Sequence, residues 1–184
     1  LTGIPTPTAK DPATAPTVQA QVQPSRPIPD KPALATDQPS ERILRDAAYN
    51  AGIRGMWLAQ LMANARHETQ NFARLSETGN AAHFNHTYGN RYGNDSPGDG
   101  NRYRGRGFLH HTFKSWYDRI GNGIGRNLVR SPALLEDPHI AAAAAIWYWK
   151  EIIMRRVGDE NAGNIDRIAN IINPYGREEA RNER

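Results

Sequence analysis

Two glutamates, Glu68 and Glu77, have the residue type and spacing to carry chemistry, and they stand nine residues apart. Two carboxylates that face one cleft can cleave a glycosidic bond, one as general acid and the other as base or nucleophile. The same spacing fits a helix-end glutamate and a loop glutamate on a solvated surface. The pair predicts a glycosidase site only if the fold brings both side chains into one cleft.

The sequence before Glu68 indicates that the two carboxylates have different surroundings. Leu61, Ala65 and Glu68 fall at positions i, i+4 and i+7 of a predicted helix over residues 55–69. A carboxyl at the rim of such an apolar stripe is partly desolvated, which raises its pKa and keeps it protonated. Glu77 follows in a stretch rich in Ser, Thr, Gly and Asn, where we expect it to be hydrated and ionised.

The elements that must position this pair are predicted to be mainly helical. Residues 70–107 are crowded with Asn and Gly and are predicted to form loops. No internal repeat and no strand with alternating polarity is visible in the sequence. The other predicted helices are 41–51, between an N-cap at Ser40 and a stop at Gly52, then 112–120, then 138–154 behind an N-cap at Asp137, and a last helix between Asn164 and Pro174.

Composition separates a linker from a folded domain. Residues 1–40 hold 9 of the 13 prolines and no aromatic residue, so we expect an extended tether ahead of a domain over 41–184. A net charge of +4 suits an anionic partner such as nucleic acid, a membrane surface or an acidic cell-wall polymer. No apolar run is long enough to span a membrane, no signal peptide is visible, and the absence of cysteine excludes disulfides.

Two other patterns suggest binding sites and are interpreted as structural. Residues 101–108 combine arginine, glycine and aromatics as RNA-binding segments do, but one copy inside a domain fits a buried arginine turn better. The His67-Glu68 pair lacks the second histidine that a metalloprotease helix requires, and His83 and His86 alone are weak zinc ligands. We therefore predict no metal or other cofactor and no nucleic-acid partner. The remaining histidines are His110, His111 and His139.

Several motifs in order resemble one enzyme family. The chain contains LAQLMANARHET at 58–69, TYGNRYGNDSPGDGNRYRGRG at 87–107, SPALLEDP before an Ala-rich helix, and IINP near its end. Together with Glu77, they resemble glycoside hydrolase family 19, the chitinases and similar phage endolysins, over about residues 42–176. The resemblance is greatest to the bacterial and phage branch. It implies a mainly α, two-lobed, lysozyme-like fold with a cleft between the lobes.

The resemblance also implies an inverting mechanism. Glu68 would protonate the glycosidic oxygen, and Glu77 would activate a water that the hydroxyl of Thr112 helps to hold. Inversion needs carboxylates roughly 6.5–9.5 Å apart, which leaves room for this water. Arg106 would be a structural group near the acids, and Arg181 is a candidate for a late arginine of the family. The residues expected to contact substrate are His67, Tyr103, Arg106, His110, Trp116, Tyr117 and Asn173.

Two positions depart from the family pattern. His110 stands where a glutamine is usual, and Trp116 replaces the asparagine of an Asn-Tyr pair whose tyrosine, Tyr117, is kept. Histidine preserves hydrogen bonding but adds a group that titrates near pH 6.5. Tryptophan can stack on a sugar but cannot make the bonds of an amide. We expect an active enzyme with altered substrate contacts.

The expected activity is that of a lysozyme or endolysin that cuts the β-1,4 bond between amino sugars of bacterial peptidoglycan. Chitin is the second candidate substrate. The expected location is a phage virion, associated with its tail through residues 1–40, or the host cytoplasm or periplasm. Two other interpretations stay open. One is a structural subunit of a phage particle, and the other is a lytic transglycosylase, which uses one acid and no catalytic water.

Overall fold

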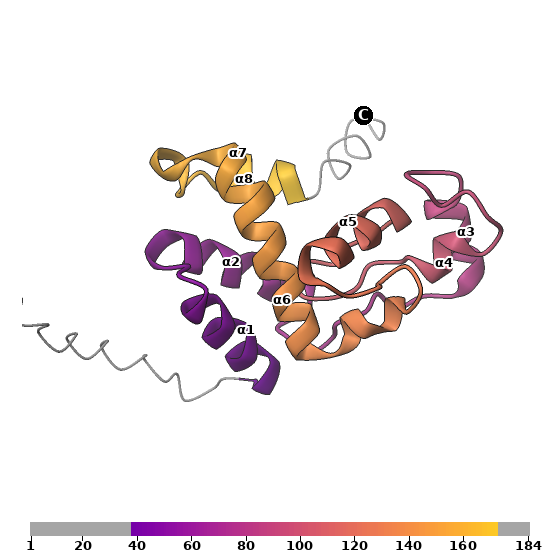
Figure 1. Cartoon of the computed structure of the whole chain (residues 1–184), viewed down its shortest axis with the longest axis horizontal. Coiled ribbons are helices and arrows are strands. Elements are labelled where there is room, and N and C mark those ends of the chain that lie inside the picture. Colours follow the sequence, from indigo (N-terminus) through magenta and orange to yellow (C-terminus); the bar gives the residue numbers. More distant parts are fainter. Residues whose placement is uncertain (1–37, 173–184) are drawn as a thin grey trace, which may run out of the picture. The chain divides into compact units, whose positions relative to one another are not determined.

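The computed structural model describes residues 38–172, which fold around one long helical segment (Figure 1). In this segment α6 (Pro138–Tyr148) continues into a π-helical stretch, η2 (Trp149–Met154), and then into α7 (Arg155–Val157). The helix predicted over 138–154 is therefore confirmed, with a change of helical type that the sequence did not indicate.

Two predicted helix caps are also confirmed. The carboxylate of Asp137 accepts hydrogen bonds from the backbone N–H groups of His139 (2.9 Å) and Ile140 (3.1 Å) at the start of α6. Asn164 precedes α8 (Ile165–Ile172), and its side-chain oxygen accepts a bond from a backbone N–H in the first turn. Short polar side chains thus fix where both helices begin.

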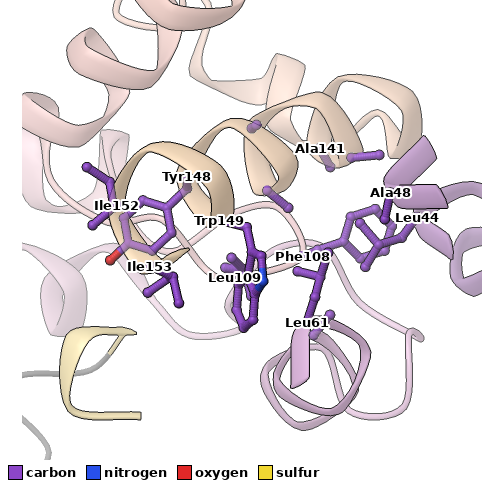
Figure 2. Close-up of a cluster of buried hydrophobic side chains, with 14 of the residues drawn as sticks. Leu44, Ala48, Leu61, Phe108, Leu109, Ala141, Tyr148, Trp149, Ile152 and Ile153 are labelled. Atoms are coloured by element: carbon purple, nitrogen blue, oxygen red, sulfur yellow. The ribbon is translucent and has the colours of Figure 1, made fainter. Parts of the chain in front are cut away.

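The main core lies on both sides of α6. α1 (Pro39–Asn50) and α5 (Lys114–Ile124) pack against α6, and α2 (Gly55–Glu68) packs against α1. Four of the five alanines of α6 (Ala141, Ala142, Ala144 and Ala145) are almost completely buried, and small side chains allow the neighbouring helices to approach closely. Figure 2 shows larger buried side chains around this helix, among them Leu44, Leu61, Phe108, Leu109, Trp149, Ile152 and Ile153.

The predicted start of α1 was wrong by two residues. The helix begins at Pro39, whose ring suits the first turn, and Ser40 makes no capping bond. Instead, the Ser40 hydroxyl donates a 2.7 Å hydrogen bond to the carbonyl oxygen of Phe72. Ser40 therefore ties α1 to the turn that follows α2.

The stretch predicted as loop contains two helices, so that prediction was wrong in part. α3 (Ala81–Tyr88) begins at Asn80, whose side-chain oxygen accepts a 2.8 Å bond from a backbone N–H of the first turn. α4 (Asp99–Arg102) packs against α3. A Cβ atom on Gly100 would lie 2.4 Å from the carbonyl oxygen of Phe84, so only glycine permits this contact. The asparagines that predicted loops instead cap a helix or make buried hydrogen bonds that join separate parts of the chain.

We call α3, α4 and residues 89–98 between them the small lobe. Its interior is aromatic and separate from the main core: Phe84 stacks on Tyr88 at 6.1 Å between ring centroids, and Tyr88 meets Phe113 edge-on at 5.5 Å. Asn94 is fully buried and fixes the loop, because its amide donates to the Tyr88 carbonyl (2.9 Å) and accepts from the Lys114 backbone N–H (2.9 Å). A small lobe beside a larger helical core agrees with the expected mainly α architecture.

Short elements complete the described chain. η1 (Pro132–Glu136) precedes α6, and η3 (Asp159–Asn161) follows α7. Residues 38–172 contain no β-strand, only two isolated antiparallel bridges. None of the helices in this range has the length and apolarity to cross a membrane. Most of the predicted tether (residues 1–37) lies outside the described residues, as do Asn173, Pro174 and Arg181.

Candidate active site

A left-handed turn directs the chain away from Glu68, the last residue of α2. The three residues 70–72 have positive φ angles of 50°, 63° and 63°, although none is glycine. Such backbone is costly and persists where the surroundings fix it. The buried hydroxyl of Thr69 does so, because it donates to the Ala65 carbonyl (2.5 Å) and accepts from the Phe72 N–H (2.9 Å). The turn leads the chain from one glutamate toward the other.

Glu68 is an acid in a partly apolar position. Its side chain is 25% exposed, and burial is the main reason why its pKa is raised, in the direction that the sequence predicted. The positive forms of His110 and His67 act in the opposite direction, and the negative charge of Glu77 adds to the increase. The closest of these groups is His110, whose Nδ1 lies 3.9 Å from Glu68 Oε2. A carboxyl in these surroundings is suited to hold a proton and release it to a substrate.

Glu77 is held by hydrogen bonds to both of its carboxylate oxygens. The Tyr88 hydroxyl donates to Oε1 and the Gly105 backbone N–H donates to Oε2, each at 2.8 Å. The backbone N–H of Glu77 in turn donates to the Gly105 carbonyl at 3.0 Å. An ionised carboxylate only accepts hydrogen bonds, so two donors suit the anion. Gly105 also provides space, because a Cβ atom there would lie 2.9 Å from Glu77 Cδ.

Both glutamates line one open pocket with a volume of about 190 Å³. The structure thus brings together three of the predicted site residues, Glu68, Glu77 and His110. The other side chains around the pocket are polar; three come from the segment between the two glutamates and one directly follows Glu77. They are Gln70, Arg74, Ser76 and Thr78.

Arg106 lies behind Glu77 and is buried, with only 4% of its surface exposed. Its guanidinium donates to Glu136 Oε1 (2.7 Å), to the Tyr117 hydroxyl (3.0 Å) and to the Arg102 carbonyl (2.8 Å). Its backbone forms antiparallel bridges to the residue before Glu77 and to His111. Arg106 therefore organises the backbone beside the pocket, which agrees with the interpretation of this run as a buried arginine turn.

Several predicted contact residues lie away from the pocket wall. Tyr103 and Tyr117 are buried, and the pKa of Tyr117 is raised to about 12 chiefly by burial. Trp116 is half-buried with its ring 5.2 Å from that of Tyr148. The hydroxyl of Thr112 donates a 2.9 Å bond to the carbonyl of His110, two residues before it. The pocket wall includes neither Thr112 nor His67, which is exposed at the end of α2.

Sequence reasoning missed the groups that hold Glu77. Tyr88 and Gly105 belong to runs that carried the family resemblance, but neither was singled out. Gln70 and Arg74 were missed as well, because no local pattern shows that the segment after α2 turns back to form the pocket wall. The glycine at position 105, within the Arg-Gly run, was the one local signal for a close backbone approach.

The histidines serve different roles. His111 is buried, and burial is the main reason why its pKa is lowered to about 3, so it is neutral at ordinary pH. Its ring lies 5.0 Å from that of Tyr148 in the main core. Within residues 38–172, no three His, Asp or Glu side chains gather as a metal site would require.

A mainly helical domain with two carboxylates of unequal surroundings in one open pocket has the form of a glycoside hydrolase. The model of the Glyco_hydro_19 family, described as Chitinase class I, matches residues 47–163. The chain therefore belongs to glycoside hydrolase family 19, as its motifs indicated.

Curated relatives match over short segments. The acidic 26 kDa endochitinase of Solanum lycopersicum is 47% identical over 51 residues, which cover 26% of this chain and 20% of the relative. A glycosyl hydrolase family 19 domain-containing protein of Haemophilus influenzae is 35% identical over 68 residues, or 36% of this chain and 34% of the relative. The chain thus spans between a fifth and about a third of the length of these relatives.

A solved structure supports the same fold. Chitinase C from Streptomyces griseus is similar with a TM-score of 0.55 and 24% sequence identity, over 72% of this chain and 70% of that one. At this identity the likeness supports the arrangement of helices rather than a substrate.

Proposed function

We propose that this chain is an inverting glycoside hydrolase that cleaves the β-1,4 bonds of peptidoglycan. The observation that carries the proposal is the pair of unequal carboxylates, Glu68 and Glu77, in one pocket. A protonated acid and an ionised base are what single-displacement hydrolysis requires.

Glu68 is proposed to be the general acid. Its raised pKa, caused mainly by burial, keeps it protonated at a higher pH than an exposed glutamate. As the bond to the leaving sugar breaks, the Glu68 proton passes to the glycosidic oxygen. The new hydroxyl leaves with that sugar, and Glu68 becomes a carboxylate.

Glu77 is proposed to be the general base. Each of its oxygens accepts one hydrogen bond in the structure and retains a lone pair for a second. A water between Glu77 and the sugar ring loses a proton to the carboxylate as its oxygen attacks the anomeric carbon. Attack from the face opposite to the leaving group inverts the anomeric configuration. Tyr88 and Gly105 fix the direction in which the carboxylate points.

Peptidoglycan is favoured as the substrate because the chain carries a net charge of +4 and the bacterial wall is anionic. Chitin is the second candidate, since similar proteins bear the names endochitinase and chitinase. Both polymers present β-1,4-linked N-acetylated amino sugars, so the same pair of carboxylates could act on either.

The test is mass spectrometry of soluble products from purified peptidoglycan and from chitin oligosaccharides, with wild type beside Glu68→Gln and Glu77→Gln. We expect reducing-end muropeptides from wild type and a loss of at least about 100-fold in each variant. Glu41→Gln, on α1, is the matched control and should behave as wild type. NMR of the fresh anomers should show inversion.

Each other result contradicts a defined part of the proposal. Cleavage of chitin alone would show that chitin, and not peptidoglycan, is the substrate. Products with 1,6-anhydro ends would show that the reaction is transglycosylation and not hydrolysis. No cleavage of either polymer would favour a structural subunit without enzymatic activity.

A further inference from the structure

Arg74 is the positively charged side chain of the pocket wall that has no partner in the described part of the chain. It is exposed and lines the same pocket as Glu68 and Glu77. Glu68 already lies beside His110, and both oxygens of Glu77 accept hydrogen bonds. Among residues 38–172, no side chain forms a hydrogen bond or an ion pair with the Arg74 guanidinium.

The backbone under Arg74 is fixed although its side chain is not. The Arg74 N–H donates a 3.1 Å hydrogen bond to the carbonyl of Thr69, inside the left-handed turn. The carbonyl of the next residue, Leu75, accepts a 2.9 Å bond from the N–H of Gly107. A guanidinium on a fixed base can hold a ligand in a defined position, because less conformational freedom is lost on binding.

The carboxylate that the proposed mechanism requires at Glu77 repels a polymer that carries negative charge near the bond to be cut. An arginine on the same wall offsets this repulsion and offers two parallel N–H donors, which match a carboxylate. Chitin consists of hydroxyl and acetamido groups and has no such anion. Peptidoglycan does, because every second sugar bears a lactyl group, whose carboxyl is either free or extended by a peptide with further carboxylates.

We propose that Arg74 binds a carboxylate carried by the substituted sugar of peptidoglycan and so favours peptidoglycan over chitin. This inference rests on the proposed hydrolase activity and assigns substrate selection to one side chain of the same pocket. A solvated arginine without this role would influence both polymers alike, or neither.

The test compares Arg74→Gln with wild type on native peptidoglycan, on peptidoglycan whose carboxyls are converted to amides with carbodiimide and ammonia, and on chitin oligosaccharides. Arg155→Gln is the matched control. Arg155 is exposed on α7, where it pairs with Glu151. It is not among the residues that line the pocket of Glu68 and Glu77, and Asp159, four residues after it, bonds to Trp57 at the end of α2 opposite to Glu68.

We expect Arg74→Gln to reduce kcat/KM on native peptidoglycan about tenfold, the effect of losing one accessible charge-assisted hydrogen bond. Amidation of the substrate should reduce the wild-type value by a similar factor and the Arg74→Gln value by less than about twofold. The rate on chitin should change by less than about twofold. Equal losses on native and amidated peptidoglycan, or an equal loss with Arg155→Gln, would overturn the inference.

A binding measurement separates this inference from the proposed activity. In a Glu68→Gln background, co-sedimentation with insoluble native peptidoglycan should weaken about tenfold when Arg74→Gln is added, and it should not weaken with amidated peptidoglycan. If binding depends on Arg74 but wild type cleaves nothing, the proposed hydrolase activity is contradicted, while the proposal that Arg74 binds a carboxylate stands. If wild type cleaves peptidoglycan but binding does not depend on Arg74, the proposal that Arg74 binds a carboxylate is contradicted, while the proposed hydrolase activity stands.

Discussion

Packing in the main core holds Glu68, whereas hydrogen bonds from the small lobe and from Gly105 beyond it hold Glu77. Glu68 ends a helix whose buried face contains Leu61 and Ala65, both fully buried. Glu77 receives a tyrosine hydroxyl from α3 and a backbone N–H from Gly105. Apolar surroundings favour the neutral form of a carboxyl, and donors favour the anion. The comparison teaches that two identical side chains acquire different surroundings from the regions that support them, as the proposed roles of acid and base require.

Packing and hydrogen bonding also differ in how they respond to a substitution. Packing is distributed over many side chains, so the loss of one contact changes the position of Glu68 little. Hydrogen bonds are directional, and Glu77 depends on a few of them. Substitutions around Glu77 should therefore affect catalysis without affecting the fold, and the following predictions test this difference.

The largest effect is expected at Gly105. In Gly105→Ala the new methyl would lie 2.9 Å from Glu77 Cδ, so the carboxylate must move. A displacement of about 1 Å at a catalytic group can cost about 100-fold in rate, which we expect in kcat. Gly163→Ala is the control, since no atom lies within 4 Å of a Cβ at that position. An unchanged kcat in Gly105→Ala would mean that Glu77 is not held as described.

His111 joins the two regions, because its backbone pairs with Arg106 behind Glu77 and its ring contacts Tyr148 of the main core. Its folded pKa of about 3 lies below the unfolded value of 6.5, since burial disfavours the cation. The unfolded chain therefore binds the extra proton first. The contribution of neutral His111 to the free energy of unfolding is fully present above pH 6.5. It decreases as the pH falls toward 3, by up to about 1.4 kcal/mol per pH unit.

Urea unfolding at pH 7 and pH 5 measures this effect. Wild type should lose up to about 2 kcal/mol over this interval, and His111→Leu should lose clearly less. The exposed His139 provides the control, and His139→Gln should keep the wild-type pH dependence. The same pH dependence in His111→Leu would show that this buried histidine is not the cause.

A smaller effect on catalysis is expected at Tyr88. Tyr88→Phe removes one of the two donors to the Glu77 carboxylate and keeps the ring between Phe84 and Phe113. We expect kcat to fall about tenfold, because this factor corresponds to the free energy of one hydrogen bond to a charged group. KM and the melting temperature should change little. Tyr49→Phe on α1 removes a hydroxyl away from the pocket and should have no effect. A loss of melting temperature equal to that of activity would indicate a structural role instead.

The smallest effect is a shift of the pH profile in His110→Gln. The positive form of His110 lowers the pKa of Glu68, against the larger increase caused by burial. Without this cation, Glu68 keeps its proton to higher pH, so the basic limb of kcat/KM should move upward by less than about one pH unit. His86→Gln on α3 should not move it. A shift to lower pH would contradict the assignment of Glu68 as the acid.

The surroundings of Glu68 were predictable from sequence because they are local. The apolar stripe of α2 indicates that the carboxyl is partly buried, and residues within seven positions carry that information, whereas the neighbouring His110 comes from far along the chain. The caps of α6 and α8 were predictable for the same reason. Each depends on one side chain and the N–H groups that follow it.

The surroundings of Glu77 were not predictable in this way. Its partners Tyr88 and Gly105 lie 11 and 28 residues further along the chain, and only tertiary folding brings them together. The left-handed turn over 70–72 contains no glycine that would signal it. The helices of the small lobe were not predicted either, since its asparagines are typical of loops but serve here as a helix cap and as buried hydrogen-bonding groups.

The π-helical stretch Trp149–Met154 sets the angular phase between the two ends of the long central helix. An α-helix advances by about 100° per residue, and a π-helical turn contains more residues than an α-helical one. The stretch therefore turns the later side chains, including Val157, relative to the alanine face that meets α1 and α5. Deleting one residue here would let the stretch close as ordinary α-helix, whose larger rotation per residue offsets the missing residue, so α7 would keep nearly the same phase while the widened turn against which α8 packs would be lost.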